Sequence, residues 1–158
     1  MDRFVYPATL TPDTKDGGFV VRFADVPEAI TQGEDGKDAL REAADCLEEA
    51  IANRIVMGLP LPSPSPLKKR QYAVPLPAQT AAKAALYIAL QEAKITKAAL
   101  AKRLQCDEKE VRRLLDPRHP SKLPRIEAAL AAVGQRLIIS LQSAAWCDAF
   151  NRELDYSL

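Results

Sequence analysis

The sequence of 158 residues has few of the side chains from which disulfide frameworks, metal sites and nucleophilic centres are built. It contains three cysteines, at positions 46, 106 and 147, and a single histidine. An odd number of cysteines so far apart in the chain predicts neither a disulfide framework nor a zinc site. We therefore expect a reducing, cytoplasmic environment and a protein that needs no cofactor and no metal ion.

Long apolar runs are also missing. The chain has no stretch of 18 apolar residues, and its first residues, MDRF, do not combine a basic segment with an apolar one. The first absence excludes a membrane-spanning helix, and the second argues against a signal peptide.

The whole chain has almost no excess of positive or negative charge, but its individual segments do. The 22 Lys and Arg nearly balance the 21 Asp and Glu, and a net charge of +1 argues against binding to nucleic acid. By position, however, residues 1–66 carry a net charge of −6, residues 67–77 carry +3, residues 78–142 carry +6 and residues 143–158 carry −2. An acidic half followed by a basic half predicts a different partner for each.

Proline marks the boundary between the halves. Six of the twelve prolines fall within residues 60–77, a stretch that cannot form a helix interior and is typical of a stiff, extended connector. We therefore predict two domains, residues 1–77 and 78–142, followed by a tail of residues 143–158. Trp146, Phe150 and Leu154 follow a four-residue spacing in this tail, which indicates an amphipathic helix.

The acidic half predicts an α+β domain in the order β-β-β-α-β. Residues 4–6 and 19–23 are rich in β-branched and aromatic side chains, and the glycines at 17 and 18 are typical of a hairpin turn. We expect a third strand around residues 29–31, an amphipathic helix over residues 37–57 and a short edge strand at residues 71–76.

Several motifs in this half resemble the HicB antitoxin family. They are DGGFVVRFADVP at residues 16–27, TQG at residues 31–33 and LPSP at residues 61–64, although Ala24 and Glu28 stand where the family usually has proline and glycine. The resemblance covers about the first 77 residues. It implies a truncated RNase H-like fold and binding to a small, basic, HicA-like toxin that cleaves mRNA.

An active RNase H-type nuclease is a weaker alternative for the same half. Two-metal chemistry needs several carboxylates at one point. Asp16, Asp25, Glu48 and Glu49 have the required side chains, but they fall at a turn, beyond a strand end and on the polar face of a helix. We therefore expect these carboxylates to be solvated and the protein not to be an enzyme.

The basic half predicts four helices and a strand. The first helix includes residues 83–90, and the second covers 97–104 with Thr96 as its N-cap. Asp107 and Glu110 have the spacing of a capping box at the start of a third helix, which ends near residue 115. Ser121 is the predicted cap of a fourth helix that ends at 132, and residues 136–141 are the predicted strand.

The second and third helices match a helix-turn-helix. Leu100, Ala101, Val111 and Leu114 take the inner positions, and the turn places Gln105 where a left-handed backbone is expected and glycine is favoured. Residues 80–141 also resemble the Xre-like DNA-binding domain that many HicB proteins carry.

If the third helix reads DNA, its outward side chains are the candidates for base contacts. Arg112 is the first choice for a bidentate contact to guanine, because its guanidinium presents paired donors. Other candidates on this helix are Glu108, Lys109 and Arg113, and the candidates for phosphate contacts are Lys97, Lys102, Arg118 and Lys122. An ordinary solvated surface would show the same residues.

The leading hypothesis is therefore an antitoxin that neutralises a HicA-like toxin and represses its own operon by binding double-stranded operator DNA. One helix-turn-helix covers little DNA, so we expect a homodimer or a higher oligomer, with residues 136–141 as a candidate dimerisation strand. The alternative is a free-standing transcriptional regulator whose first domain binds a ligand or oligomerises.

Overall fold

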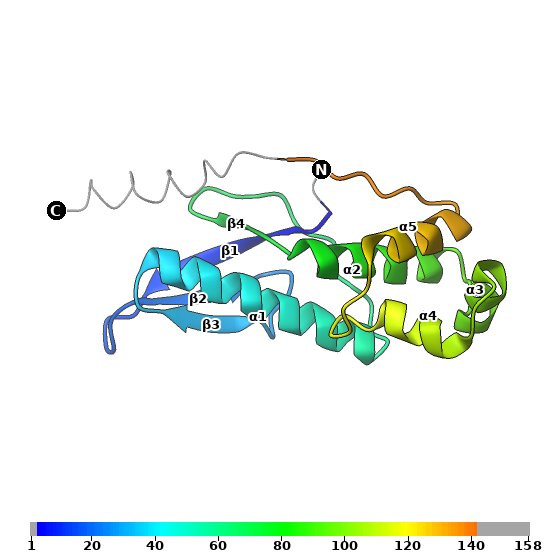
Figure 1. Cartoon of the computed structure of the whole chain (residues 1–158). Helices are drawn as coiled ribbons and strands as arrows, with labels where there is room; N and C mark the ends of the chain where they lie inside the picture. Colours follow the sequence, from blue (N-terminus) through cyan, green and yellow to red (C-terminus); the bar gives the residue numbers. More distant parts are fainter. Residues whose placement is uncertain (1–2, 142–158) are drawn as a thin grey trace. The chain divides into compact units, whose positions relative to one another are not determined.

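The computed structural model describes residues 3–141 (Figure 1). Its strands are β1 (Val5–Pro12), β2 (Phe19–Phe23), β3 (Ile30–Gly33) and β4 (Tyr72–Pro75). Its helices are α1 (Gly36–Val56), α2 (Ala78–Glu92), α3 (Lys97–Leu104), α4 (Glu108–Leu115) and α5 (Leu123–Ala132). The described residues form two compact units, one of residues 3–50, 62–76 and 140–141, the other of residues 51–61 and 77–139. The mixed α+β class predicted from the sequence is confirmed.

The first unit is built on an antiparallel sheet with the strand order β3-β2-β1-β4. Ala8 lies opposite Phe23 on one side and Tyr72 on the other, so these side chains share a face. Figure 1 shows α1 running along the sheet, and Leu47 on the apolar stripe of the helix is completely buried. The predicted third strand, helix and edge strand are confirmed, whereas β1 is longer than the predicted residues 4–6.

The proline-rich connector is anchored to the first unit rather than free. The Tyr6 hydroxyl donates to the carbonyl of Pro62 at 2.9 Å. The carboxylate of Asp25 accepts from both the backbone N–H and the hydroxyl of Ser65, at 2.9 and 3.0 Å. Because proline cannot supply a backbone N–H to pair with a sheet, these side-chain bonds hold the extended chain in place.

The second unit has a helical core. Leu86, Leu100, Val111 and Ile126 come from four different helices, and each exposes at most 1% of its surface. Helix α2 begins at Ala78, five residues before the predicted segment 83–90.

Two sequence predictions for the basic half of the chain are wrong. Ser121 does not cap α5; its N-cap is Lys122, which makes no side-chain bond. Residues 136–141 form no strand, since a strand exists only through hydrogen bonds to a neighbour and no other described segment pairs with them. The predicted tail helix within residues 143–158 lies outside the described residues.

Candidate nucleic-acid interface and acidic surface

The starts of α3 and α4, and the turn between the two helices, have local hydrogen bonds and backbone geometry that match the sequence. The Thr96 hydroxyl accepts from the N–H of Ala99 at 3.1 Å, and the Asp107 carboxylate accepts from the N–H of Glu110 at 2.7 Å. Gln105, which ends α3, has φ 53° and ψ 43°, the left-handed backbone expected at this position. Both predicted caps are confirmed, because each depends only on residues three positions apart.

The predicted inner residues of this helix pair are buried. Leu100 and Ala101 on α3 and Val111 and Leu114 on α4 expose 5% of their surface or less. Cys106 in the turn is half-buried, and its N–H donates to the carbonyl of Ala101 at 3.1 Å. Burial raises the pKa of the Cys106 thiol, so this side chain remains a neutral filler at neutral pH.

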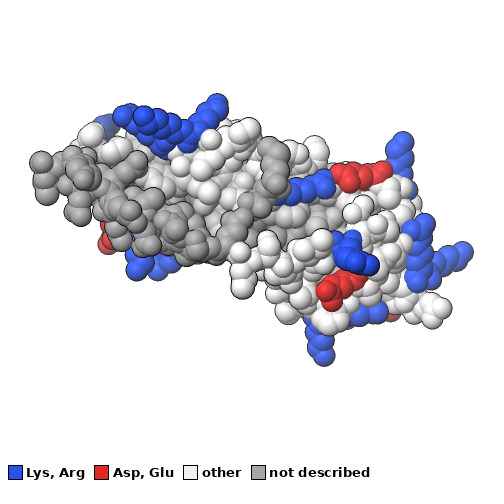
Figure 2. Space-filling model, turned by 90° about the horizontal axis from the view of Figure 1, so that it is seen from above, with Lys and Arg blue, Asp and Glu red and all other residues white. Residues whose placement is uncertain are grey.

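All eight side chains predicted to contact DNA are exposed: Lys97, Lys102, Glu108, Lys109, Arg112, Arg113, Arg118 and Lys122. Four of them share the outer face of α4, opposite its buried residues. In Figure 2, Lys and Arg side chains project from the surface of the helical second unit on the right of the view, with some Asp and Glu side chains beside them. The outer face of α4 therefore presents cationic groups to solvent.

Three of the eight, Glu108, Arg112 and Arg118, have side-chain partners in the described structure. Arg112 lies 3.6 Å from the carboxylate of Glu108, one helical turn earlier, and both side chains are at least half exposed. Such an exposed pair contributes little to stability and can separate when Arg112 finds another partner. Arg118 donates to the side-chain oxygen of Asn53 at 2.8 Å, and both residues belong to the second unit.

The capping box predicted at α4 forms only in part. Asp107 caps the helix, but the carboxylate of Glu110 accepts hydrogen bonds from Nε and Nη2 of Arg125 instead of reaching back to Asp107. This ion pair joins α4 to α5, and the hydrogen bond that Arg125 donates to Glu110 raises the pKa of the Arg125 guanidinium above its ordinary value. Arg103 on α3 donates to the carbonyl of Ala132 at 2.8 Å and caps the end of α5.

Sequence reasoning missed Lys83, which is completely buried in α2. Its ammonium group donates to three backbone carbonyls, those of Arg113 at 3.2 Å, Asp116 at 2.6 Å and His119 at 2.5 Å. Burial lowers the pKa of Lys83, and the charge of Asp116 opposes that shift. A signal was available, because Lys83 stands three residues before Leu86 and seven before Leu90 on the apolar stripe of α2.

The single histidine of the sequence, His119, is half-buried. Its Nδ1 atom is shielded from solvent and has no hydrogen-bond partner among the described residues. No cysteine or serine is joined to it by a hydrogen bond in the described structure, so the histidine is not part of a nucleophilic pair there.

An open hollow lies beside the start of α4. It is lined by Ala98, Ala99, Ala101, Lys102, Gln105, Cys106 and Glu108. Most of its lining comes from α3, and Lys102 and Glu108 contribute side chains of opposite charge.

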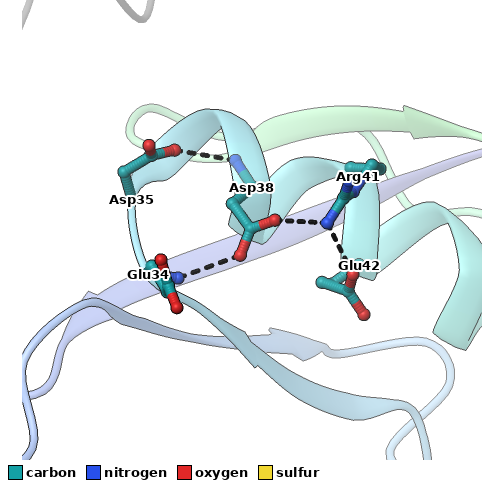
Figure 3. Close-up of polar contacts among 5 residues, drawn as sticks. All are labelled: Glu34, Asp35, Asp38, Arg41 and Glu42. Carbon is teal, nitrogen blue, oxygen red and sulfur yellow. Dashed lines mark hydrogen bonds and ion pairs between the residues drawn. The ribbon is translucent and has the colours of Figure 1, made fainter.

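The carboxylates at the start of α1 serve the helix as well as the surface (Figure 3). Asp35 accepts from the N–H of Asp38 at 2.8 Å, and Asp38 accepts from the N–H of Glu34 at 3.0 Å. Arg41 bridges Asp38 and Glu42 at 2.5 and 3.1 Å. Two of the acidic groups are therefore helix-capping groups, and Arg41 neutralises part of the local negative charge.

The carboxylates considered for a nuclease are not brought together. Asp25 is occupied by Ser65, and Asp16 lies at the exposed hairpin turn. Across residues 3–141, no group of three His, Cys, Asp or Glu side chains could hold a metal ion.

None of the helices in the described part of the chain is both long enough and apolar enough to cross a membrane.

Residues 5–85 match a protein family described as HicB_like antitoxin of bacterial toxin-antitoxin system. The chain is 36% identical over 132 residues to Antitoxin HicB of Escherichia coli (strain K12), an alignment that covers 84% of this chain and 95% of that protein. It is 34% identical over 137 residues to Antitoxin HicB 1 of Photorhabdus laumondii, which covers 87% of this chain and 86% of that protein.

These alignments are too long to end within the first half. An alignment of 132 residues cannot fit before residue 85, where the family match ends, so it must extend into the helical second unit. The likeness therefore includes both the sheet and helices of the second unit.

Proposed function

We propose, from the premise that this chain belongs to the HicB-like antitoxin family, that it neutralises a small HicA-like mRNA-cleaving toxin and binds its own operator DNA. Family membership makes the protein an antitoxin of a toxin–antitoxin system, and not an enzyme. Residues 1–77, with a truncated RNase H-like fold, would bind the toxin. Residues 78–142, with a helix-turn-helix, would bind the DNA.

The acidic first part of the chain supports a basic protein partner. Its net charge of −6 over residues 1–66 would repel the phosphates of a nucleic acid and attract a cationic surface. Asp45 and Glu49 are exposed along the outer side of α1 in addition to the carboxylates near its start. Because these carboxylates lie on a 21-residue helix, their spacing is fixed, and a basic partner can bind them with matching cationic groups.

The toxin proposal is tested by co-expression with the product of the adjacent gene. We expect a small basic protein that copurifies with the full chain, and whose ribonuclease activity the full chain abolishes. If opposite charges hold the complex together, its affinity should fall at high salt and rise at low salt. Failure of the neighbouring gene product to bind would contradict the toxin assignment and favour a free-standing regulator.

The DNA-binding proposal is carried by one observation, the outward face of α4. This face presents Lys109, Arg112 and Arg113 to solvent, directly after a turn that is fixed by two capped helix ends. A rigid helix with several cationic side chains on one side fits the major groove, and Arg112 can then exchange its exposed pairing with Glu108 for a base edge.

Two substitutions separate base contacts from phosphate contacts. Arg112→Ala should weaken binding to the operator by about 1–3 kcal/mol and relax the preference for one base pair. Lys122→Ala should weaken binding to all duplexes alike and reduce the slope of log K against log salt by about one. Both are measured by fluorescence anisotropy on the DNA upstream of the gene and on a shuffled duplex. Unchanged discrimination by Arg112→Ala would remove the base-contact role.

A further inference from the structure

We propose that Lys83 is a positioning residue for DNA recognition: it holds the end of α4 and the loop after it so that Arg118 faces the phosphate backbone. The proposal rests on the DNA-binding function above and adds to it a buried residue that itself contacts no DNA. Every residue in the argument belongs to the second unit.

The first step concerns the end of α4. The last carbonyls of a helix have no partner inside it, and a cation placed there supplies both donors and a charge that suits the helix dipole. Lys83 donates to the carbonyl of Arg113, in the last turn of α4, at 3.2 Å. It reaches this carbonyl from α2, so the end of α4 is tied to another helix rather than only to its own backbone.

The second step concerns the loop of residues 116–119. Lys83 donates to the carbonyls of Asp116 and His119 at 2.6 and 2.5 Å. The Asp116 carboxylate accepts from the N–H of Arg118 at 3.0 Å, and its carbonyl accepts from the N–H of His119 at 3.1 Å. The loop that carries Arg118 is therefore held at both ends by the same ammonium group. The exposed Arg118 guanidinium donates to the side-chain oxygen of Asn53 at 2.8 Å and would exchange that bond for one to a phosphate.

The third step is that the ammonium group has no other role within the described structure. Its three N–H bonds match three carbonyls, which is the complete hydrogen-bonding capacity of a lysine, and the residue is fully buried. An apolar residue at this point of the stripe would supply no donor: the carbonyls of Arg113 and His119 would lose the hydrogen bond from Lys83, and the carbonyl of Asp116 would keep only the one from the N–H of His119. The backbone of the loop requires the lysine, and the loop carries one of the predicted phosphate contacts.

The test is a double-mutant cycle on the full chain with Lys83→Met and Arg118→Ala, measured against the DNA upstream of the gene at several salt concentrations. Arg118→Ala should lower the salt slope by about one and weaken binding on the order of tenfold. If Lys83 acts by placing Arg118, Lys83→Met should lower the slope by the same amount, and the double variant should be no weaker than either single variant. Near-ultraviolet circular dichroism and stoichiometric titration with the duplex establish the folded, binding-competent fraction of each variant.

Lys122→Ala is the matched control, because it removes an exposed cation close in sequence to the same loop. Its effect should add to that of Arg118→Ala, as expected for two independent phosphate contacts. If Lys83→Met folds and its effect also adds to that of Arg118→Ala, or its salt slope is that of the unmodified protein, the positioning role is overturned.

A second variant keeps the proposal testable if Lys83→Met does not fold. Lys83→Gln retains two N–H donors and should give a smaller change of the same sign, whereas an unchanged salt slope would overturn the proposal. Failure of the unmodified protein to prefer the upstream DNA over a shuffled duplex would instead contradict the DNA-binding function itself.

Discussion

Gly33 stands at the end of β3, where the chain turns into α1. A Cβ atom at this position would lie 2.3 Å from the nitrogen of Ala39 and 2.4 Å from its Cα, both of which are backbone atoms of the helix. The glycine of the TQG motif is thus explained by close approach of two backbones and not by an unusual dihedral angle.

Gly33→Ala should therefore destabilise the sheet unit by about 1–3 kcal/mol, because backbone atoms cannot move aside as a side chain can. Gly58→Ala is the control, because Gly58 has φ +71° and nothing lies within 4 Å of the added Cβ atom. The only expected loss of stability there is the cost of about 1 kcal/mol for placing alanine in the left-handed backbone region. Urea unfolding measured for both variants gives the comparison. An equal or smaller loss for Gly33→Ala would contradict the steric account.

Lys83 also makes stability depend on pH. Its pKa is lowered in the folded protein from the ordinary value of 10.5, so the unfolded chain binds more protons between the two values. Stability contributed by this group then rises with pH across that interval. The difference in unfolding free energy between the unmodified protein and Lys83→Met should accordingly increase as pH approaches 10.5, and a difference that shrinks would contradict the direction of the shift.

At the scale of elements, the helix ends differ in how they are capped. Thr96 and Asp107 accept backbone hydrogen bonds at the starts of α3 and α4, whereas Ser121 does not cap α5. Thr96→Ala and Asp107→Ala should each cost about 1 kcal/mol, and Ser121→Ala should stay within about 0.5 kcal/mol. Chemical denaturation of the three variants measures this order, and a loss at Ser121 as large as at the other two would contradict it.

The elements that were predicted well depend on residues close together in the chain. Thr96, Gln105 and Asp107 were identified because a cap or a left-handed turn is decided within a few residues. The pairing of Glu110 with Arg125 was missed, since a capping box and an interhelix ion pair look the same until α5 is placed beside α4. The segment of residues 136–141 was predicted as a strand from its apolar side chains, but its pairing needs a neighbour that the described chain does not supply.

At the scale of the whole molecule, this segment remains the strongest candidate for contact between copies. Ile138, Ile139 and Leu141 expose 81%, 67% and 98% of their surface. If the segment pairs across a two-fold axis, Ile138→Lys should shift the protein toward a monomer and weaken operator binding, because one unit covers only a half-site.

Sedimentation velocity on the full chain measures that shift. Val56→Lys is a suitable control, since Val56 is an apolar residue with 60% exposure in another part of the chain. An unchanged molecular mass for Ile138→Lys, or an equal loss for both variants, would contradict a dimer contact at residues 136–141.

The sequence by itself determined the division of charge between an acidic and a basic half, the order of most elements and the family, because these depend on residue types and local spacing. Only the tertiary structure decided what each charge does. Lys83 counts toward the positive surplus yet is buried against three carbonyls from residues 30 to 36 positions away, and Asp35 and Asp38 count as acidic surface yet cap a helix. The charge of a side chain follows from its residue type alone, whereas the groups that it contacts depend on which distant parts of the chain the fold brings next to it.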